Sequence, residues 1–268
     1  MLKKSELVTN LIQIYSLVIK DLKLKFRYKL EFVVEFIAPL FTIFFPYIIF
    51  NTLFELESQA FGEESYYSQD NFILFLLLGY IVSSLIFLLW TYKDQFYDEK
   101  TWKTLNSVFI APVSKFNVLM GYLLSGVISK GFPIIFITIL CYLLYPIPLL
   151  NLMLVLLILF CISLTFAGMG FIIGLFEIVN ENISASLTIG ISFISLVSCV
   201  FYPIQIFPVQ VQFIIKLNPL YYYLELLRLS WWLGVDPETS LQYLSVFHFM
   251  IVFGFTILTP LLASILFS

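Results

Sequence analysis

Long apolar runs separated by short polar stretches dominate this sequence. A membrane-spanning helix needs ~20 predominantly apolar residues, and six of the runs reach about that length. They are Phe32–Phe54, Phe72–Trp90, Val118–Leu144, Leu149–Phe176, Ile183–Tyr202 and Leu241–Phe267. The pattern predicts an all-α integral membrane protein with six transmembrane helices, organised as a single domain over residues 1–268.

A polar, charge-mixed stretch, residues 92–115, separates the second run from the third. Its charged residues are Asp98, Glu99, Lys100 and Lys103, and its apolar residues include Leu105, Val108 and Phe109. A helix with this division of side chains lies in a membrane interface and offers its polar face to a soluble partner. The stretch therefore predicts an amphipathic helix, which ends in a Pro-containing turn before the third run.

The first 30 residues mix apolar and basic side chains. Leu7, Leu11, Ile14, Val18 and Leu22 recur at helical spacing, among lysines and arginines that can meet anionic lipid head groups. The segment lacks the uninterrupted apolar block of a cleavable signal peptide. We expect residues 1–30 to form an interfacial helix that leads into the first span.

The segment 203–234 is too interrupted to form one span. Pro203, Pro208 and Pro219 break it, and it predicts two short re-entrant helices that dip into the outer leaflet before the last span. Non-helical backbone at such depth is tolerated only where it is buried in protein or faces water. The segment should therefore lie against a lateral opening or pathway, and Glu225 and Arg228 are spaced to pair on one helix face.

Composition agrees with a membrane protein. Hydrophobic residues make up 61% of the chain, charged residues only 12%, and the mean hydropathy is +1.00, which one soluble core of 268 residues cannot accommodate. Basic residues cluster before the first span and return at residues 93–115, whereas residues 55–71 are acidic and hold no Lys or Arg. By the positive-inside rule, the N-terminus and the amphipathic stretch face the cytoplasm. With six spans the C-terminus is cytoplasmic too, although Lys216 and Arg228 lie on the outer side, against this bias.

Candidate residues for covalent chemistry are scarce. No Gly-Lys-Ser or Gly-Lys-Thr phosphate loop occurs, His248 is the only histidine, and Cys141, Cys161 and Cys199 lie within apolar runs at no metal-binding spacing. We expect the cysteines to be packing residues. The sequence thus predicts neither a nucleotide site nor a metal site in this chain.

Two features inside the membrane leave alternatives open. Lys130 lies about a dozen residues into the third span, so it either pairs or snorkels to the interface, or it faces water and touches substrate. Tyr221, Tyr222 and Tyr223 either form part of an outer aromatic belt or line a substrate path. In the fourth span, Gly168, Gly170 and Gly174 predict close helix packing.

Two groups of residues resemble motifs of the permease subunits of ABC-2 type exporters. The first consists of Glu99, Lys103, Thr104, Leu105, Asn106, Ala111, Pro112, Val113, Ser114 and Gly121. The family usually has Gly where Lys103 stands and Glu where Asn106 stands. The second group consists of Phe201, Tyr202, Pro203, Phe207, Pro208, Asn218, Pro219, Leu220, Glu225 and Arg228, where the family has its re-entrant helices. With the spans, the resemblance covers nearly the whole chain.

The resemblance implies a permease in the plasma (inner) membrane that pairs with a second copy, as a homodimer among lipids. Each copy would engage a separate ATPase subunit, which binds the ATP and Mg, while this chain carries no cofactor and binds no nucleic acid. The ATPase-coupling residues would be Asp98, Glu99, Lys103, Thr104, Leu105, Ala111, Pro112 and Ser114. Substrates in the family include hydrophobic drugs, lipids and lipid-linked polysaccharides.

An autonomous secondary transporter or channel is the alternative. Lys130, Glu35 and His248 would then form an ion or proton relay within the membrane. Such a transporter should show an internal repeat with broken helices in matching positions, and the sequence shows none.

Overall fold

Nearly all of the described backbone is helical, as the apolar runs predict. The computed structural model describes residues 2–27, 29–56, 71–101, 103, 110, 113–179 and 183–267, and no strand occurs within these ranges. The helices are α1 (Leu2–Arg27), α2 (Lys29–Leu56), α3 (Phe72–Thr101), α5 (Lys115–Leu144), α6 (Leu149–Val179), α7 (Ile183–Leu196), α8 (Val209–Leu217), α9 (Pro219–Trp232), α10 (Pro237–Tyr243) and α11 (Val246–Phe267), with a short 3-10 turn, η2, at Ile204–Ile206. The prediction of an all-helical membrane protein is confirmed.

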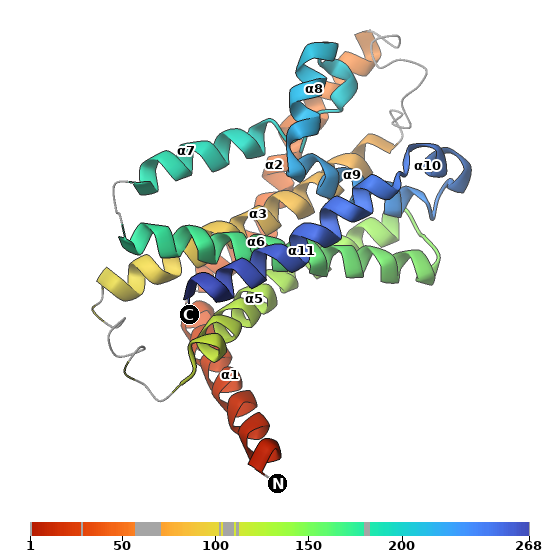
Figure 1. Ribbon diagram of the computed structural model, residues 1–268. Helices are drawn as coiled ribbons and strands as arrows, with labels where there is room; N and C mark the ends of the chain where they lie inside the picture. The colour runs from red at the N-terminus through yellow and green to blue at the C-terminus, as the bar shows by residue number, and fades with distance from the viewer. Residues whose placement is uncertain are drawn as a thin grey trace.

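The core forms around α3, which packs against α2, α5, α6 and α9. In Figure 1, α3, α6 and α11 run side by side through the centre of the molecule. Most side chains of α3 up to Tyr92 are buried, and Leu76, Ile81 and Leu88 are fully so, whereas Phe87 is exposed. A helix that is apolar all round is a buried helix, so α3 occupies the middle of the bundle.

Four helices in the described part of the chain are long and apolar enough to cross a membrane. The crossing stretches are Phe72–Lys93, Phe116–Leu144, Leu149–Glu177 and Val246–Leu266, in α3, α5, α6 and α11. These correspond to the second, third, fourth and sixth predicted spans. The apolar stretch in α2, Phe36–Ile49, is shorter, and α7 has 14 residues, so the predicted count of six is not established by length alone.

The second span does not end at Trp90 as predicted. Helix α3 continues without a break to Thr101, so the first part of the predicted amphipathic stretch is an extension of this span. No Pro or Gly follows Gly79 within the helix to interrupt it. The consequence is a single rigid element that joins the bundle core to the region of the predicted coupling residues.

The fifth predicted span ends six residues early, at Leu196 instead of Tyr202. Cys199 has a φ of 58°, in the left-handed region that ends helices, and Pro203 disfavours helical backbone just before it. The three cysteines are free and buried, and Cys199 lies in this turn and not within a span.

The sixth predicted span starts late. Residues 241–243 belong to the separate helix α10, and α11 begins at Val246. Ser245 stands directly before α11, and its Oγ lies 2.8 Å from Nδ1 of His248. This contact pairs the side chains of Ser245 and His248 where α11 begins.

Arg228 of α9 joins the turn after α7 to α3. Its guanidinium donates hydrogen bonds to the carbonyl oxygens of Val200 (2.6 Å) and Cys199 (3.2 Å) and lies 3.6 Å from the ring centroid of Phe75. These two backbone carbonyls accept the hydrogen bonds of Arg228, and its pairing with Glu225 stays a prediction. Carbonyls exposed where a helix stops within apolar surroundings need such a donor.

Helix approach at the centre requires glycine at several positions. A Cβ on Gly168 would lie 2.7 Å from the backbone of Thr259 in α11, and a Cβ on Gly170 would lie 2.7 Å from the carbonyl oxygen of Leu89 in α3. The predicted close packing at Gly168 and Gly170 is confirmed. These contacts bring α3, α6 and α11 together.

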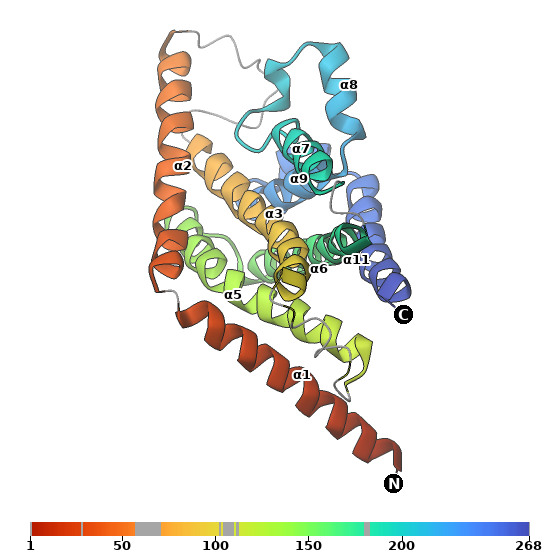
Figure 2. The ribbon, with the colours of Figure 1, turned by 90° about the vertical axis from the view of Figure 1, so that its left-hand side faces the viewer.

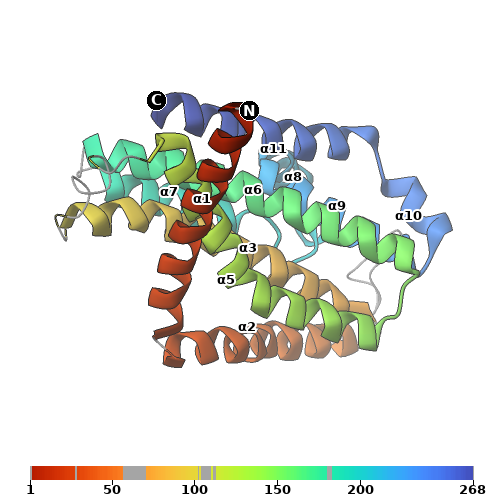
Figure 3. The same cartoon turned by 90° about the horizontal axis from the view of Figure 1, so that it is seen from below.

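Helix α1 lies across one end of the bundle, and α2 turns away from it along the side (Figures 2 and 3). Phe26 of α1 meets Phe132 edge to face, and Phe36 of α2 meets Phe136 in the same way. Helix α1 is therefore supported by α5, whereas α2 contacts α5 and packs more extensively on α3. We call the end that α1 covers the α1 end, and the opposite end, at α8, the α8 end.

Replacing Gly79 by Ala should destabilise the protein. The added Cβ would lie 2.2 Å from the carbonyl oxygen of Val200, which Arg228 already fixes, and such overpacking costs ~1–3 kcal/mol. Thermal unfolding in detergent measures the effect. Gly131→Ala is the matched control, because no atom lies within 4 Å of its Cβ, and it should be neutral or stabilise α5 by ~0.5–1 kcal/mol. Equal stability of both variants would contradict the close contact.

Candidate functional site

Four of the predicted coupling residues are described, and they lie where α3 ends and α5 begins. Asp98 and Glu99 fall in the last turn of α3, and Lys103 follows as an exposed turn residue. Thr104, Leu105, Ala111 and Pro112 lie outside the described residues. Ser114 begins the next helix: its side chain accepts a hydrogen bond from the backbone N–H of Asn117 (3.2 Å) and so caps α5. Ser114 thus fixes where the segment after α3 re-enters the bundle.

Lys103 adopts a conformation that suits glycine. Its φ is 57°, and its backbone N–H donates to the carbonyl oxygen of Lys100 at 3.1 Å. Helices commonly end on a left-handed residue of this kind, usually Gly. Lys103 therefore stands where α3, the helix that carries the predicted coupling residues Asp98 and Glu99, terminates.

A row of polar contacts attaches α1 to α5. The side-chain amide of Asn117 donates to Asn10 Oδ1 (2.9 Å) and Gln13 Oε1 (2.7 Å). One turn further along α5, a Cβ on Gly121 would lie 2.7 Å from Cβ of Leu17. The absence of a side chain at Gly121 therefore lets α1 approach the α5 backbone.

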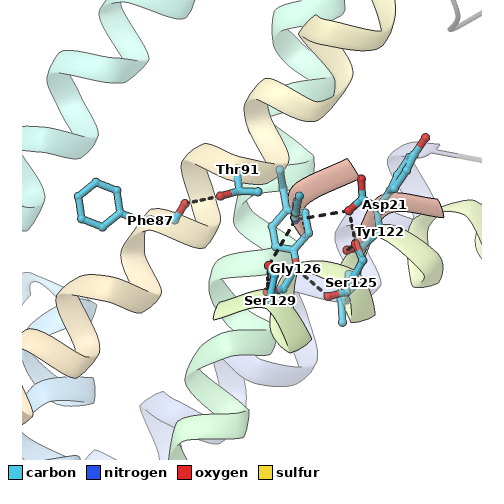
Figure 4. Close-up of polar contacts among 10 residues, drawn as sticks. Asp21, Phe87, Thr91, Tyr122, Ser125, Gly126 and Ser129 are labelled. Atoms are coloured by element: carbon cyan, nitrogen blue, oxygen red, sulfur yellow. Dashed lines mark hydrogen bonds and ion pairs between the residues drawn. The ribbon is translucent and has the colours of Figure 1, made fainter. Parts of the chain in front are cut away.

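The row continues with a buried carboxylate. Asp21, which is 6% exposed, accepts a hydrogen bond from the hydroxyl of Ser125 and lies 3.4 Å from Nζ of Lys25. Lys25 also donates to Ser129 Oγ at 3.4 Å. Figure 4 shows Asp21 directed from α1 toward Ser125 and its neighbours on α5. These residues recur every three or four positions on both helices, so one stripe on each helix forms the whole contact. We call this contact between α1 and α5 the α1 seam.

The same level of the bundle holds Tyr92 of α3. Its hydroxyl donates to the carbonyl oxygen of Leu123 at 2.6 Å, and its ring lies 4.7 Å from that of Phe171 in α6. A Cβ on Gly126 would lie 2.2 Å from the tyrosine oxygen. Tyr92 therefore fixes α3 against both α5 and α6.

Next to Tyr92, a buried ion pair connects α3 and α6. Lys93 Nζ lies 3.7 Å from Glu177 Oε2, and both residues are buried, at 7% and 4% exposure. Lys93 also sits 5.3 Å from the ring centroid of Trp90. A buried charge is strongly destabilising without its partner. The pair therefore couples the position of α3, two turns before its end, to the last turn of α6.

The residues predicted to line a substrate path lie in helices α5 and α9. Tyr223 is fully buried, and its hydroxyl donates to Thr165 Oγ1 (3.2 Å). Tyr222 donates to the carbonyl oxygen of Lys216 (2.8 Å), and Tyr221 packs edge to face against Tyr222. Lys130 is half-buried on α5. It directly follows Ser129, whose Oγ accepts a hydrogen bond from Lys25 of the basic helix α1.

The re-entrant residues hold the α8 end together. Pro203 is buried at the start of η2, and Pro219 occupies the first turn of α9. Asn218 caps α9 by accepting from the N–H of Leu220 (3.0 Å), and its amide donates to Ile194 O (2.9 Å) and Ser198 Oγ (2.8 Å). Asn218 thus ties the start of α9 to the end of α7.

Helix α7 stands apart from the rest of the bundle. It packs only loosely on α6, and Figures 1 and 2 show it set off from the central helices. Two cavities flank it, of about 530 Å³ between α7, α6 and the start of α9, and of about 700 Å³ between α7 and α3. We call these two spaces together the α7 cleft. Volumes in this range are typical of small-molecule sites.

The sequence-predicted path residues are not the ones that line the α7 cleft. Neither cavity is lined by Lys130 or by Tyr221, Tyr222 or Tyr223. Polar lining residues come from α3 and α7, where Ser83, Trp90 and Ser192 line the larger cavity, and from Tyr202 and Asn218 after α7. The signal that could have found them is the pair of serines, Ser192 and Ser195, one turn apart in an otherwise apolar run. Of the residues proposed for a relay, His248 contacts Ser245 and Tyr222, Lys130 lies on α5 and Glu35 belongs to α2. The relay stays a prediction.

A family model described as ABC-2 type transporter matches residues 12–232. The chain belongs to this family. The match begins within α1 and ends with α9, so it includes the α1 seam, the ion pair and the α7 cleft. This is a family of transmembrane permeases and not of catalytic subunits, so the chain is the membrane component of an ABC-2 type transporter. No curated protein matches the chain.

The ion pair gives a stability test. Glu177→Leu alone removes the carboxylate of the buried ion pair and should lower the free energy of unfolding by ~3–5 kcal/mol, whereas Lys93→Met with Glu177→Leu should recover most of the loss. Unfolding in detergent measures both variants. Glu238→Leu, at an exposed acid on α10, is the control and should change stability by less than ~0.5 kcal/mol. A double variant as unstable as Glu177→Leu would contradict the pairing.

Proposed function

We propose that this chain is the permease subunit of an ATP-driven exporter that moves a hydrophobic or amphipathic substrate across or out of the membrane. The observation that carries the proposal is the family match over residues 12–232. The α7 cleft supports it, because its lining is apolar with a few hydroxyl and aromatic groups. Such a lining suits a drug, a lipid or the lipid part of a glycan.

The proposed topology has six crossings with both termini in the cytoplasm of the plasma (inner) membrane. Helix α2 supplies the first crossing, at ~1.5 Å per residue over 28 residues. Helix α7 covers only ~21 Å at that rise, and the turn and short helices up to α9 complete its passage. The basic residues of α1 and of residues 93–115 support a cytoplasmic α1 end.

Movement of the ATPase reaches the bundle through α3 in this proposal. A soluble partner that contacts Asp98, Glu99, Lys103 and the following residues 104–114 pushes on a helix that runs unbroken into the core. Lys93 and Glu177 pass that displacement to the last turn of α6, directly before α7. Helix α7 then moves relative to α3, which changes the width of the cleft.

The proposal also includes the partners of this chain. A separate ATPase subunit binds ATP and Mg and performs the hydrolysis, while this chain performs no covalent chemistry. A second copy of the permease completes the transporter as a homodimer, and lipids surround both copies. Helix α1, held on α5 by the Asn117 and Asp21 contacts, provides a basic surface beside the coupling residues for the head groups or the ATPase.

Purification of the tagged protein from its native membrane tests the proposal. We expect an ATPase to copurify with the wild type and to be lost from Glu99→Arg with Thr104→Arg, because two new positive charges change the coupling surface. Unaltered thermal unfolding of the variant would show that the loss is local.

The matched control places the same two new arginines away from the α1 end. Gln205→Arg with Glu238→Arg changes one polar and one acidic residue, both exposed, and should retain the ATPase. Absence of any ATPase from the wild type would overturn the exporter, and loss from the control alone would move the coupling surface elsewhere.

A further inference from the structure

The two halves of the α7 cleft differ in chemistry although they adjoin. Ile86 of α3 lines both cavities, so the two spaces meet at this side chain. Helix α7 presents Ile191 and Ile194 to the smaller cavity, which Val197 in the following turn also lines, and Ser192 and Ser195 to the larger one. At three-residue spacing these positions form two neighbouring faces of one helix.

The smaller cavity offers no hydrogen bonds. Asn218 is its one polar lining residue, and both ends of its amide are engaged: the nitrogen donates to Ile194 O and Ser198 Oγ, and the oxygen accepts from Leu220 N. All other lining residues, such as Phe166, Met169 and Leu217, are apolar. An apolar space without free polar groups excludes water and accepts hydrocarbon.

The larger cavity contains hydroxyl groups without partners. Ser84 in α3, Ser195 in α7 and Ser198 just after α7 each donate to a backbone carbonyl three or four residues earlier, and Ser195 does so although it lines the larger cavity. Ser83 and Ser192 make no such bond to any described residue, although both line the cavity. Within a bilayer an unsatisfied polar group is costly, so these hydroxyls call for a hydrogen-bonding ligand.

Among the described residues, no charged side chain lines either cavity. Both sets of lining side chains are aliphatic, aromatic, hydroxyl or amide. Moving an ionised group into such a space without a counter-charge is strongly unfavourable. The polar part of a ligand should therefore be uncharged and able to hydrogen-bond, as a glycerol or sugar hydroxyl is.

We propose that the α7 cleft binds an uncharged amphiphile, whose single hydrocarbon chain fills the apolar cavity past Ile194 and whose hydroxyl-bearing group bonds to Ser83 and Ser192. The inference rests on the proposed function in naming the substrate class of the exporter. The surrounding bilayer already solvates hydrocarbon, so the chain itself adds little selectivity. Discrimination comes from the two serine hydroxyls.

Photolabelling of the purified protein in phosphatidylcholine nanodiscs tests the site. Three probes carry the same diazirine-bearing 16-carbon chain and end in a glycerol ester, a methyl ester or a sulfonate. We expect the glycerol ester to label about tenfold more than the other two, since two hydrogen bonds distinguish it. Excess unlabelled monopalmitoylglycerol should abolish the difference, and the labelled peptides should come from α6 and α7.

Two variants test separately the binding of the hydroxyl-bearing group and of the hydrocarbon chain. Ser83→Ala with Ser192→Ala should reduce labelling by the glycerol ester to that of the methyl ester, and Ile194→Trp should fill the apolar cavity and lower labelling about fivefold or more. The controls are Ser186→Ala and Ile189→Trp, at α7 positions that line neither cavity. Both should label as the wild type does.

Several results would overturn the inference. Preferential labelling by the sulfonate, or labelling that both tryptophan variants lower equally, excludes an uncharged ligand in this cleft. A change of oligomeric state in Ile194→Trp with unchanged labelling would show that a second copy of the chain fills the space. The labelling assay needs no ATPase, so it tests the ligand site separately from the proposed function. Labelling as expected without a copurifying ATPase would support the site and overturn the exporter. Failed labelling with a copurifying ATPase would overturn the site and support the exporter.

Discussion

The buried guanidinium of Arg228 decides the shape of the α8 end. It donates to the carbonyls of Cys199 and Val200 and lies against the ring of Phe75, so the turn after α7 is fixed to α3 beside Gly79. A cation amid apolar side chains is tolerated when oxygen acceptors and an aromatic face surround it. With its far end fixed in this way, α7 approaches α3 at the turn and diverges from α6 along its length. The two cavities are the space that this divergence leaves.

The α1 end is organised on the opposite principle, as a dense set of polar contacts among well-packed helices. The α1 seam, the Tyr92 hydroxyl and the Lys93–Glu177 pair all lie within the same few turns of α3, α5 and α6. In a membrane each of these groups needs its specific partner, because no water can replace it. The end that we propose to meet a soluble partner thereby has many specific contacts, while helix α7 beside the cleft has few.

Structural roles explain many of the charged and polar residues that invite a functional interpretation. Asp21 is occupied by Ser125 and Lys25, Asn218 by the ends of α7 and α9, and Tyr223 by Thr165. Ser83 and Ser192 differ because their hydroxyls face a cavity and bond to no described residue. In a helical membrane domain the informative polar group is thus the one whose hydrogen bonds are missing.

The sequence by itself determined the helical membrane character, the approximate positions of most helices and the basic character of one end, because length, hydropathy and charge are local properties of the chain. Its family motifs also identified the segment that joins α3 to α5. Only the tertiary structure decided that α3 is central and α7 peripheral, since runs that are apolar on every face carry no period that tells a packed face from an exposed one. It also decided that Arg228 serves two carbonyls, and that Asn10 and Asp21 meet Asn117 and Ser125 about a hundred positions away. Such contacts depend on the relative placement of whole helices, which no local pattern specifies.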